Sequence, residues 1–182
     1  MSRQQTERVY DELLVTMARA GDRRAANRLA ARWYPRLMRT ALRLLRDRSE
    51  AEEAVQEAWA GICRGWARLS DPAMFPGWAF GILRRKCADR IRRAQIQRTR
   101  TGTLEDAPEP SEPARAELRH ELDQALADLS GEHRLAAVLY FGEGLTLNEI
   151  AAATGVPVGT AKSRIFNARK RLKSNLKGEN DE

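Results

Sequence analysis

Apolar residues recur every three or four positions through much of the chain, the spacing that places them on one face of an α-helix. The first such row predicts a helix from Ala25 onward and consists of Leu29, Trp33, Leu37, Ala41, Leu44 and Leu45, with Pro35 as a residue able to kink it. A second row predicts a helix over about residues 50–68 and consists of Ala51, Ala54, Val55, Ala58, Trp59 and Ile62. Because Ser49 and Glu52 have the spacing of a capping box, we expect Ser49 to cap this second helix.

Residues 69–78 combine turn-forming residues with three large side chains, Met74, Phe75 and Trp78. Turn formers predict a loop. Aromatic side chains in such a loop either pack on the core, which is the commoner case, or stack on an unpaired base. A third helix is expected from Trp78 to about residue 97, with an inward row of Trp78, Ile82, Leu83 and Ile91.

The last third of the chain has the pattern of a helix-turn-helix. Two helices are expected first, one carrying Leu118, Leu122, Leu126 and Leu129 and one over about residues 132–141. Thr146 and Glu149 then form a capping box for a short helix that ends at Gly155, and Ala151 on this helix is small enough for a close helix crossing. After a turn at residues 156–159, a final helix has the inner row Ala161, Ile165, Ala168 and Leu172.

The outer face of this final helix carries only hydrogen-bond donors among its polar residues, with no acid before Glu179. Such a face is suited to an anion, and the first half of the helix is expected to reach the edges of DNA bases through Thr160, Lys162, Ser163 and Asn167. Phe166 is placed to touch a thymine methyl group, whereas Arg169, Lys170 and Arg171 are better suited to phosphates. The sequence therefore predicts that this helix reads DNA.

Composition agrees with an all-α fold and divides the 182 residues into parts. Strand-forming residues are few, and the net charge of +7 favours polyanionic partners. Residues 1–100 carry a net +11, residues 101–132 a net −7 and residues 133–182 a net +3. Because the acidic part is rich in proline and poor in apolar residues, we expect two small helical domains, 1–97 and 118–177, joined by a flexible linker, 98–117. The linker is either a solvated spacer or a mask over a basic surface.

Two further charged faces are expected in the first domain. The second helix leaves Glu50, Glu53, Gln56 and Glu57 on its outer side. A solvated helix start favoured by the helix dipole explains glutamates in the first turns, but Gln56 and Glu57 lie further in and are less easily explained that way. The third helix crowds Arg84, Arg85, Lys86, Arg90, Arg92 and Arg93 along its length. Phosphate contact explains this crowding better than solvation does, and a membrane surface is disfavoured because the helix lacks a broad bulky apolar face.

Other function classes find little support in the sequence. His120 and His133 have no nucleophile or ligand-spaced partner nearby, so we expect neither an enzyme nor a metal or other cofactor. Cys63 and Cys87 are too far apart for a metal knuckle and are expected to be buried free thiols. Since the chain shows neither an apolar signal core nor a membrane-length apolar run, it is expected to be cytoplasmic and not inserted in a membrane.

Both halves together resemble the extracytoplasmic-function (ECF) group of bacterial sigma factors, the promoter-specificity subunits of RNA polymerase. The resemblance spans residues 25–174 and lies in four segments: Trp33–Leu37, Ser49–Trp59, Phe75–Trp78 and Leu145–Arg164. Two departures from the family pattern concern the expected minus-10 preference. One is Arg85-Lys86, where many members have Arg-Asn, and the other is Gly77, where a polar residue often precedes the tryptophan. They leave the family resemblance intact.

The resemblance implies a role for each charged face. The acidic face, with Glu53, Gln56 and Glu57, would dock on the clamp helices of the polymerase β′ subunit. The minus-10 element, with a captured non-template base, would be bound by Arg68, Met74, Phe75, Trp78, Arg84, Arg85, Lys86, Arg90 and Arg93. The minus-35 element would be read by Thr160, Lys162, Ser163, Arg164, Phe166, Asn167, Arg169, Lys170 and Arg171. The linker would thread the polymerase channel, and the polymerase β flap and an anti-sigma protein are further implied partners.

Two other functions are compatible with the same residues. The first is a two-domain helix-turn-helix regulator that acts without polymerase and uses its N-terminal domain as a sensor or for dimerisation. The second is a helical adaptor whose basic faces meet acidic proteins, for which binding would lack the steep salt dependence of multiple phosphate contacts.

Overall fold

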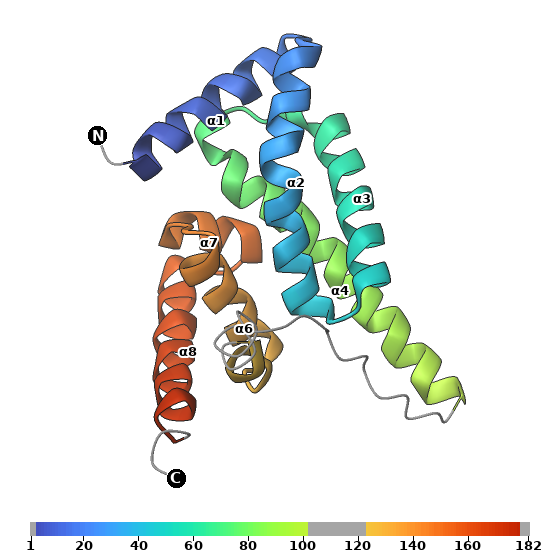
Figure 1. Ribbon diagram of the computed structural model, residues 1–182, viewed down its shortest axis with the longest axis vertical. Coiled ribbons are helices and arrows are strands. Elements are labelled where there is room, and N and C mark those ends of the chain that lie inside the picture. The colour runs from blue at the N-terminus through green and yellow to red at the C-terminus, as the bar shows by residue number, and fades with distance from the viewer. Residues whose placement is uncertain (1–2, 102–122, 179–182) are drawn as a thin grey trace, which may run out of the picture.

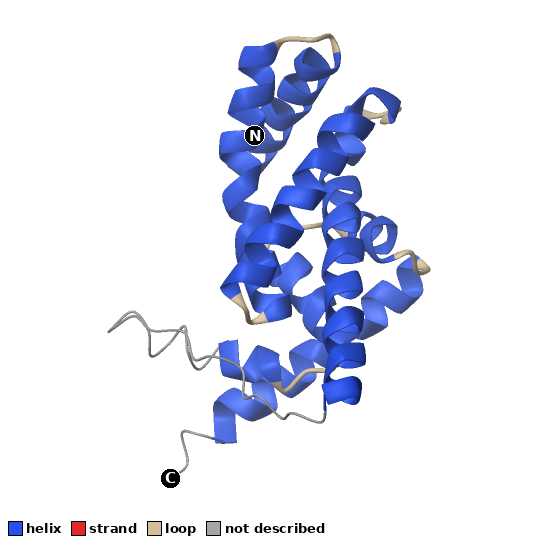
Figure 2. Ribbon diagram, turned by 90° about the vertical axis from the view of Figure 1, so that its right-hand side faces the viewer, coloured by secondary structure: helices blue, strands red, loops and turns tan. Residues whose placement is uncertain are grey.

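The computed structural model describes residues 3–101 and 123–178, and every regular element in this part of the chain is helical (Figure 2). The N-terminal unit contains α1 (Arg3–Arg19), α2 (Arg23–Leu45), α3 (Arg48–Gly65), the 3₁₀ turns η1 (Trp66–Arg68) and η2 (Pro72–Met74), and α4 (Phe75–Thr101). The C-terminal unit contains α6 (Gly131–Ala137), the π-helical turn η3 (Val138–Gly142), α7 (Leu147–Thr154) and α8 (Val158–Gly178). The expected linker begins inside α4 and otherwise lies outside the described residues.

Helix ends follow local capping chemistry, with one correction to the expected boundaries. α3 is capped by Asp47, whose carboxylate accepts from the backbone N–H of Glu50, so the expected cap at Ser49 is wrong. Asp47 takes this role because Arg46, the residue after the end of α2, is in the left-handed conformation that turns the chain toward α3. The capping box of Thr146 and Glu149 is confirmed at the start of α7.

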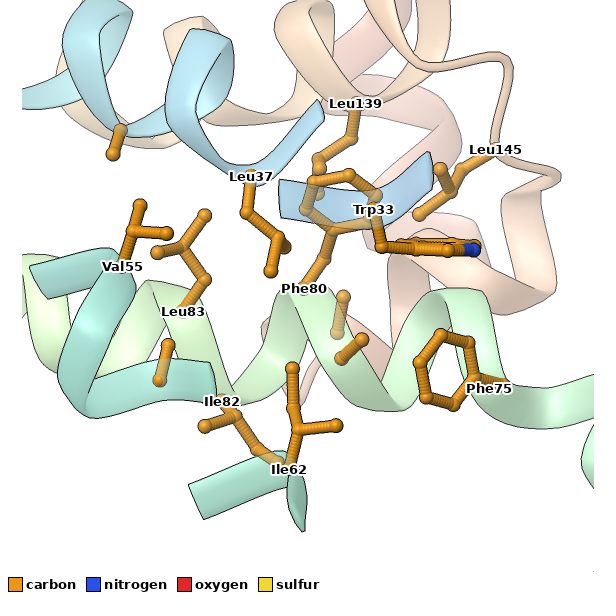
Figure 3. Close-up of a cluster of buried hydrophobic side chains, with 14 of the residues drawn as sticks. Trp33, Leu37, Val55, Ile62, Phe75, Phe80, Ile82, Leu83, Leu139 and Leu145 are labelled. Carbon is orange, nitrogen blue, oxygen red and sulfur yellow. The ribbon is translucent and has the colours of Figure 1, made fainter. Parts of the chain in front are cut away.

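The expected apolar rows of α2 and α3 are confirmed as the core of the N-terminal unit. Trp33 lies at its centre with no exposed surface, and α2 continues through Pro35 to Leu45. Phe75 meets the Trp33 ring edge to face at a centroid distance of 4.8 Å, and Phe80 lies on the same ring at 5.8 Å (Figure 3). These aromatic contacts join α4 to α2 and fix where α4 begins.

Three details of the N-terminal unit differ from the expectations. The helix α1 was not expected, although Leu14, Val15 and Ala18 on it are buried. Ile91 is 41% exposed, so its expected place in the inward row is wrong; at this level of α4 the residue buried against α3 is Arg90, one position earlier. Cys87 is a buried free thiol as expected, whereas Cys63 is exposed on the outer side of α3.

The C-terminal unit is a helix-turn-helix whose inner row is confirmed. Ala161 and Ala168 on α8 are fully buried, and Ile165 is 7% exposed. α7 ends at Gly155 in the left-handed conformation, which a glycine adopts without strain, and the turn to α8 follows at once. None of the described helices is long and apolar enough to cross a membrane.

Arg134 on α6 ties the C-terminal unit together. Its guanidinium donates to the backbone carbonyls of Leu126, Ala127 and Leu129, which lie at the end of the preceding helical segment. Burial, and after it the neighbouring charge of Arg46, lower the pKa of Arg134, the direction expected for a cation withdrawn from water. The side chain therefore acts as a cap for the carbonyl end of that segment.

Replacing Arg134 with methionine is expected to lower the free energy of unfolding by about 2 kcal/mol, because hydrogen bonds from a charged donor are lost. Urea unfolding followed by circular dichroism measures this change. The matched control is Arg93→Met on α4, where the arginine is exposed and the change should stay within about 0.5 kcal/mol. Equal stability of the two variants would contradict the capping role.

The two units pack directly on each other, and the main buried cluster contains residues from both (Figure 3). Figure 1 shows α7 beside the first turns of α4. α7 packs on α4 at Gly77 and Gly81, which together form the glycine seat of α7. A Cβ atom at Gly77 would lie 2.8 Å from the carbonyl oxygen of Glu149, and one at Gly81 would lie 3.4 Å from the backbone of Ala153. The close helix crossing therefore depends on glycines of α4.

Ion pairs from α1 and α2 also join the units, and the two shortest have buried glutamates. Arg8 on α1 donates to both carboxylate oxygens of Glu149, at 2.7 and 3.0 Å, and to the carbonyl oxygen of Gly144. Arg36 on α2 donates to the carboxylate and the carbonyl of Glu143, at 2.9 and 3.0 Å. The two glutamates are buried and both arginines are partly buried, so these pairs add charged hydrogen bonds to the apolar packing.

Candidate nucleic-acid interface

The outer face of α8 is an open polar surface. Its exposed members are Lys162, Ser163, Phe166, Asn167, Arg169, Lys170 and Arg171, and Phe166 is 68% exposed. Within the described part of the chain, the side chains of Lys162, Asn167, Arg169, Lys170 and Arg171 have no intramolecular hydrogen bond or ion pair. A row of free donors beside an exposed aromatic ring is suited to a nucleic-acid groove.

Three residues expected on this face are in part engaged within the protein. Arg164 pairs with Glu132 at the start of α6, at 2.5 Å, and its side chain is 18% exposed. The Ser163 hydroxyl donates to the carbonyl oxygen of Thr160, and Thr160 is half-buried. The pairing of Arg164 with α6 fixes the start of α8 on the scaffold, which orients the free donors that follow.

α4 carries two kinds of basic residue, which its sequence did not distinguish. Arg85 and Arg93 are exposed, and Arg92, also exposed, pairs with Asp89 one turn earlier. Arg84 is half-buried, and its Nε lies buried without a hydrogen-bond partner among the described residues. Lys86 and Arg90 point instead at α3, so the expected basic row is divided between solvent and protein.

The acidic face of α3 surrounds Arg90. The guanidinium lies 2.7 Å from a carboxylate oxygen of Glu50, 2.9 Å from one of Glu53 and 2.8 Å from one of Glu57. Lys86 lies 2.9 Å from the second oxygen of Glu57. Hydrogen bonds from Lys86 and then Arg90 hold the pKa of Glu57 below its ordinary value. Gln56, the third expected docking residue, is exposed one position before Glu57.

The large side chains of the segment between α3 and α4 differ in how far they are exposed. Met74 is 40% exposed and Arg68 is exposed, whereas Phe75 is 1% exposed against Trp33. Trp78 is half-buried, with its ring 6.1 Å from that of Phe75. Of the two alternatives for these side chains, packing on the core holds for Phe75, whereas Met74 is exposed and Trp78 is partly accessible.

Sequence comparison finds two family patterns, one in each helical unit of the chain. The pattern of Sigma-70 region 2 matches residues 29–96, and that of Sigma-70 region 4 matches residues 125–174. The ECF RNA polymerase sigma factor SigM of Mycobacterium tuberculosis is 35% identical over 167 residues, which cover 91% of this chain and 84% of SigM. SigL of the same species is 32% identical over 149 residues, 77% of this chain and 82% of SigL.

Solved structures agree with this assignment. The sigma factor RpoE from Bartonella quintana, in complex with the anti-sigma factor NepR, superposes with a TM-score of 0.69 at 26% identity over 83% of this chain and 96% of RpoE. CnrH, in complex with the cytosolic domain of CnrY, has a TM-score of 0.67 at 24% identity and shares the fold. The chain therefore belongs to the ECF RNA polymerase sigma factors and is a promoter-specificity subunit of RNA polymerase.

Proposed function

We propose that each charged face of the structure serves one contact in transcription initiation. The acidic face of α3, with Glu53, Gln56 and Glu57, docks on the clamp helices of the polymerase β′ subunit. The segment from Arg68 to Trp78 and the exposed basic residues of α4 bind the minus-10 element. The outer face of α8 reads the minus-35 element, while the C-terminal unit contacts the β flap.

The observation that carries the proposal is the acid-free outer face of α8. Lys162 and Asn167 in its first half are exposed and free, as base-edge contacts require, and Arg169, Lys170 and Arg171 follow where phosphates would run. This order, with base readers first and phosphate contacts second, is that of a recognition helix entering the major groove with its N-terminal end.

Promoter melting on this proposal is driven by binding alone. Met74 and the half-buried Trp78 are the surfaces on which an unstacked base would rest, and the exposed cation Arg85 lies seven residues further along α4. Phe75 supports this site from within the core, where it anchors the start of α4 on Trp33. The chain thus acts by trapping a strand, and no residue is assigned a catalytic step.

The arrangement of the units implies a change of shape on the promoter. Elements centred about 25 base pairs apart are separated by roughly 85 Å of duplex at 3.4 Å per base pair. α7 of the minus-35 reader rests directly on α4 of the minus-10 reader. On this proposal polymerase holds the two units apart when both elements are bound, and the packed form is that of the chain before assembly.

The proposal is tested with purified core polymerase. The chain should co-elute with core enzyme and start transcription from promoters selected from genomic DNA by the reconstituted holoenzyme. A chain that binds duplex DNA by itself yet neither co-elutes with the core enzyme nor starts transcription would contradict the proposal. An anti-sigma protein is a further proposed partner, supported by the Bartonella quintana complex.

Two substitutions on α8 should affect DNA binding in different ways. Asn167→Ala is expected to relax the preference at one position of the minus-35 element by about 1–3 kcal/mol. Arg171→Gln is expected to weaken binding to all sequences alike and to reduce the salt slope by about one unit. Binding of holoenzyme to a set of single-base promoter variants, at two salt concentrations, distinguishes them. Identical profiles for both variants would contradict the assigned roles.

A further inference from the structure

Arg90 has an unusual position for a residue on a basic helix. It is 8% exposed, while the three glutamates that surround it keep between 42% and 59% of their side-chain surface. Those glutamates come from one face of α3, 33 to 40 positions earlier in the chain. The guanidinium is therefore the buried centre of a cluster whose acidic members form part of the surface.

Arg90 offsets the repulsion between neighbouring carboxylates of α3. Glu50, Glu53 and Glu57 follow one another at three and four positions, so their carboxylates lie side by side and repel. Arg90 meets each of them within 2.9 Å, and its planar guanidinium can serve several carboxylates at once, which a lysine ammonium does less well. Burial lowers the pKa of Arg90, but the hydrogen bonds that Arg90 donates to the glutamates outweigh burial and raise the pKa, so the cation is permanent.

The hydrogen-bond pattern leaves part of each carboxylate available. Glu50 and Glu53 each use one oxygen on Arg90, and their second oxygens have no partner among the described residues. Glu57 uses one oxygen on Arg90 and the other on Lys86. Arg90 thus limits the rotamers of three acidic side chains and keeps free oxygens of Glu50 and Glu53 at the surface. Ordering side chains before binding lowers the entropy lost on association.

We infer that Arg90 is a positioning residue of the polymerase-docking surface, and that Glu50 belongs to this surface together with Glu53, Gln56 and Glu57. The inference rests on the proposed function, in which the acidic face of α3 binds polymerase. It replaces the expected role of Arg90 in minus-10 binding, because a phosphate contact would require Arg90 to leave three carboxylates. Minus-10 contacts from this helix then come from exposed residues such as Arg85 and Arg93.

The test compares Arg90→Gln with the matched control Arg93→Gln in the full chain. Affinity for core polymerase is measured by fluorescence titration, and promoter affinity is measured on holoenzyme assembled at saturating core. Arg90→Gln is expected to weaken core binding about tenfold, equivalent to 1.4 kcal/mol, and to leave promoter affinity unchanged. Arg93→Gln is expected to leave core binding unchanged and to weaken promoter binding. The reverse pattern would overturn the inference.

A double-mutant cycle separates positioning from general damage to the fold. If Arg90 acts through Glu53, Arg90→Gln should weaken core binding far less in a Glu53→Gln background than in the parent. Additive losses would show that Arg90 does not act through Glu53 and would overturn the inference. Arg90→Lys keeps the charge and should recover part of the core affinity. Circular dichroism and thermal unfolding of each variant identify any loss of folded protein.

The same variants distinguish this inference from the proposal on which it rests. If Glu53→Gln leaves core binding unchanged, the docking role of α3 fails, and the positioning role fails with it. If Glu53→Gln weakens core binding while Arg90→Gln does not, the docking role stands and only the positioning role fails. Glu50→Gln completes the set: it should weaken core binding, and an unchanged affinity would remove Glu50 from the surface.

Discussion

Replacing Gly77 with alanine is expected to separate the two helical units of the free chain while both stay folded. The added Cβ would lie 2.8 Å from the carbonyl oxygen of Glu149 and 3.1 Å from its Cα, distances that backbone atoms do not tolerate. Because Glu149 belongs to a capped helix, it cannot retreat alone, and α7 as a whole must leave its seat on α4. Small-angle X-ray scattering should show a radius of gyration several ångströms larger than that of the parent.

Amide hydrogen exchange in α4 and α7 distinguishes separation of the units from unfolding. Gly77 lies in the first turn of α4, where alanine is at least as favourable as glycine, so the substitution does not destabilise α4 itself once α7 has moved away. Amide exchange should therefore slow or stay unchanged in the middle of α4, while amides of α7 exchange faster. Exchange that accelerates throughout both units would show unfolding and would contradict the predicted opening.

Two other glycines provide a graded control for Gly77. A Cβ at Gly81 would lie 3.4 Å from Ala153, an ordinary contact distance, so Gly81→Ala should open the chain far less. A Cβ at Gly131 would meet nothing within 4 Å, and Gly131→Ala should leave the scattering curve unchanged. The same radius of gyration for Gly77→Ala and Gly131→Ala would show that the glycine seat does not hold the units together.

Features with a local cause were predictable from the sequence. The capping box of Thr146 and Glu149 and the inner row of α8 depend on residues within a few positions of one another, and both are confirmed. The cap of α3 was assigned to Ser49 and not to Asp47, because two capping residues stand close together and the path of the chain after α2 decides between them. Local signals thus fixed the helices to within a few residues.

The first helix could have been found from its spacing. Tyr10, Leu14 and Ala18 stand four positions apart, and Leu14 and Ala18 are buried. Asp11 breaks the apolar pattern beside them, yet it is buried too, because Arg32 on α2 donates to it at 2.7 Å. A buried carboxylate whose partner lies far along the chain makes an inward face look polar in the sequence.

Long-range contacts decide the parts of the candidate site that the sequence left open. The basic composition of α4 predicted exposed cations, and this holds for Arg85 and Arg93 but not for Arg90, whose partners lie on α3. Gly77 and Gly81 have the four-residue spacing of a close helix crossing, and that spacing was the available signal for the seat of α7. Which helix would occupy the seat depends on the fold as a whole.

Glu149 is expected to contribute more to stability than any other glutamate of the C-terminal unit. Its carboxylate accepts from the backbone N–H and the hydroxyl of Thr146, at 2.7 and 2.9 Å, and from Arg8 across the interface. Glu149→Ala removes the cap, worth about 1 kcal/mol, and a charged hydrogen bond worth about 1.5–3 kcal/mol. The free energy of unfolding in urea should therefore fall by about 3 kcal/mol.

Matched variants divide this loss between the cap and the interface. Glutamine also serves in capping boxes, so Glu149→Gln should keep the cap and lose only the ion pair. Arg8→Gln removes the same pair from the other side and should cost a similar amount, about two thirds of the loss in Glu149→Ala. A loss in Arg8→Gln as large as that in Glu149→Ala would show that the cap contributes nothing.

The ion pair also predicts how stability depends on pH. Burial pushes the pKa of Glu149 upward, but the hydrogen bonds from Arg8 and Thr146 outweigh burial and hold it below the ordinary value of 4.5. A carboxylate with a lowered pKa stabilises the folded chain above pH 4.5, and this contribution is lost as the pH falls through its folded pKa. Urea unfolding between about pH 7 and pH 3 should therefore show a steeper loss of stability for the parent than for Glu149→Gln. Parallel curves would mean that other carboxylates carry the acid sensitivity and that Glu149 is not charged within the interface.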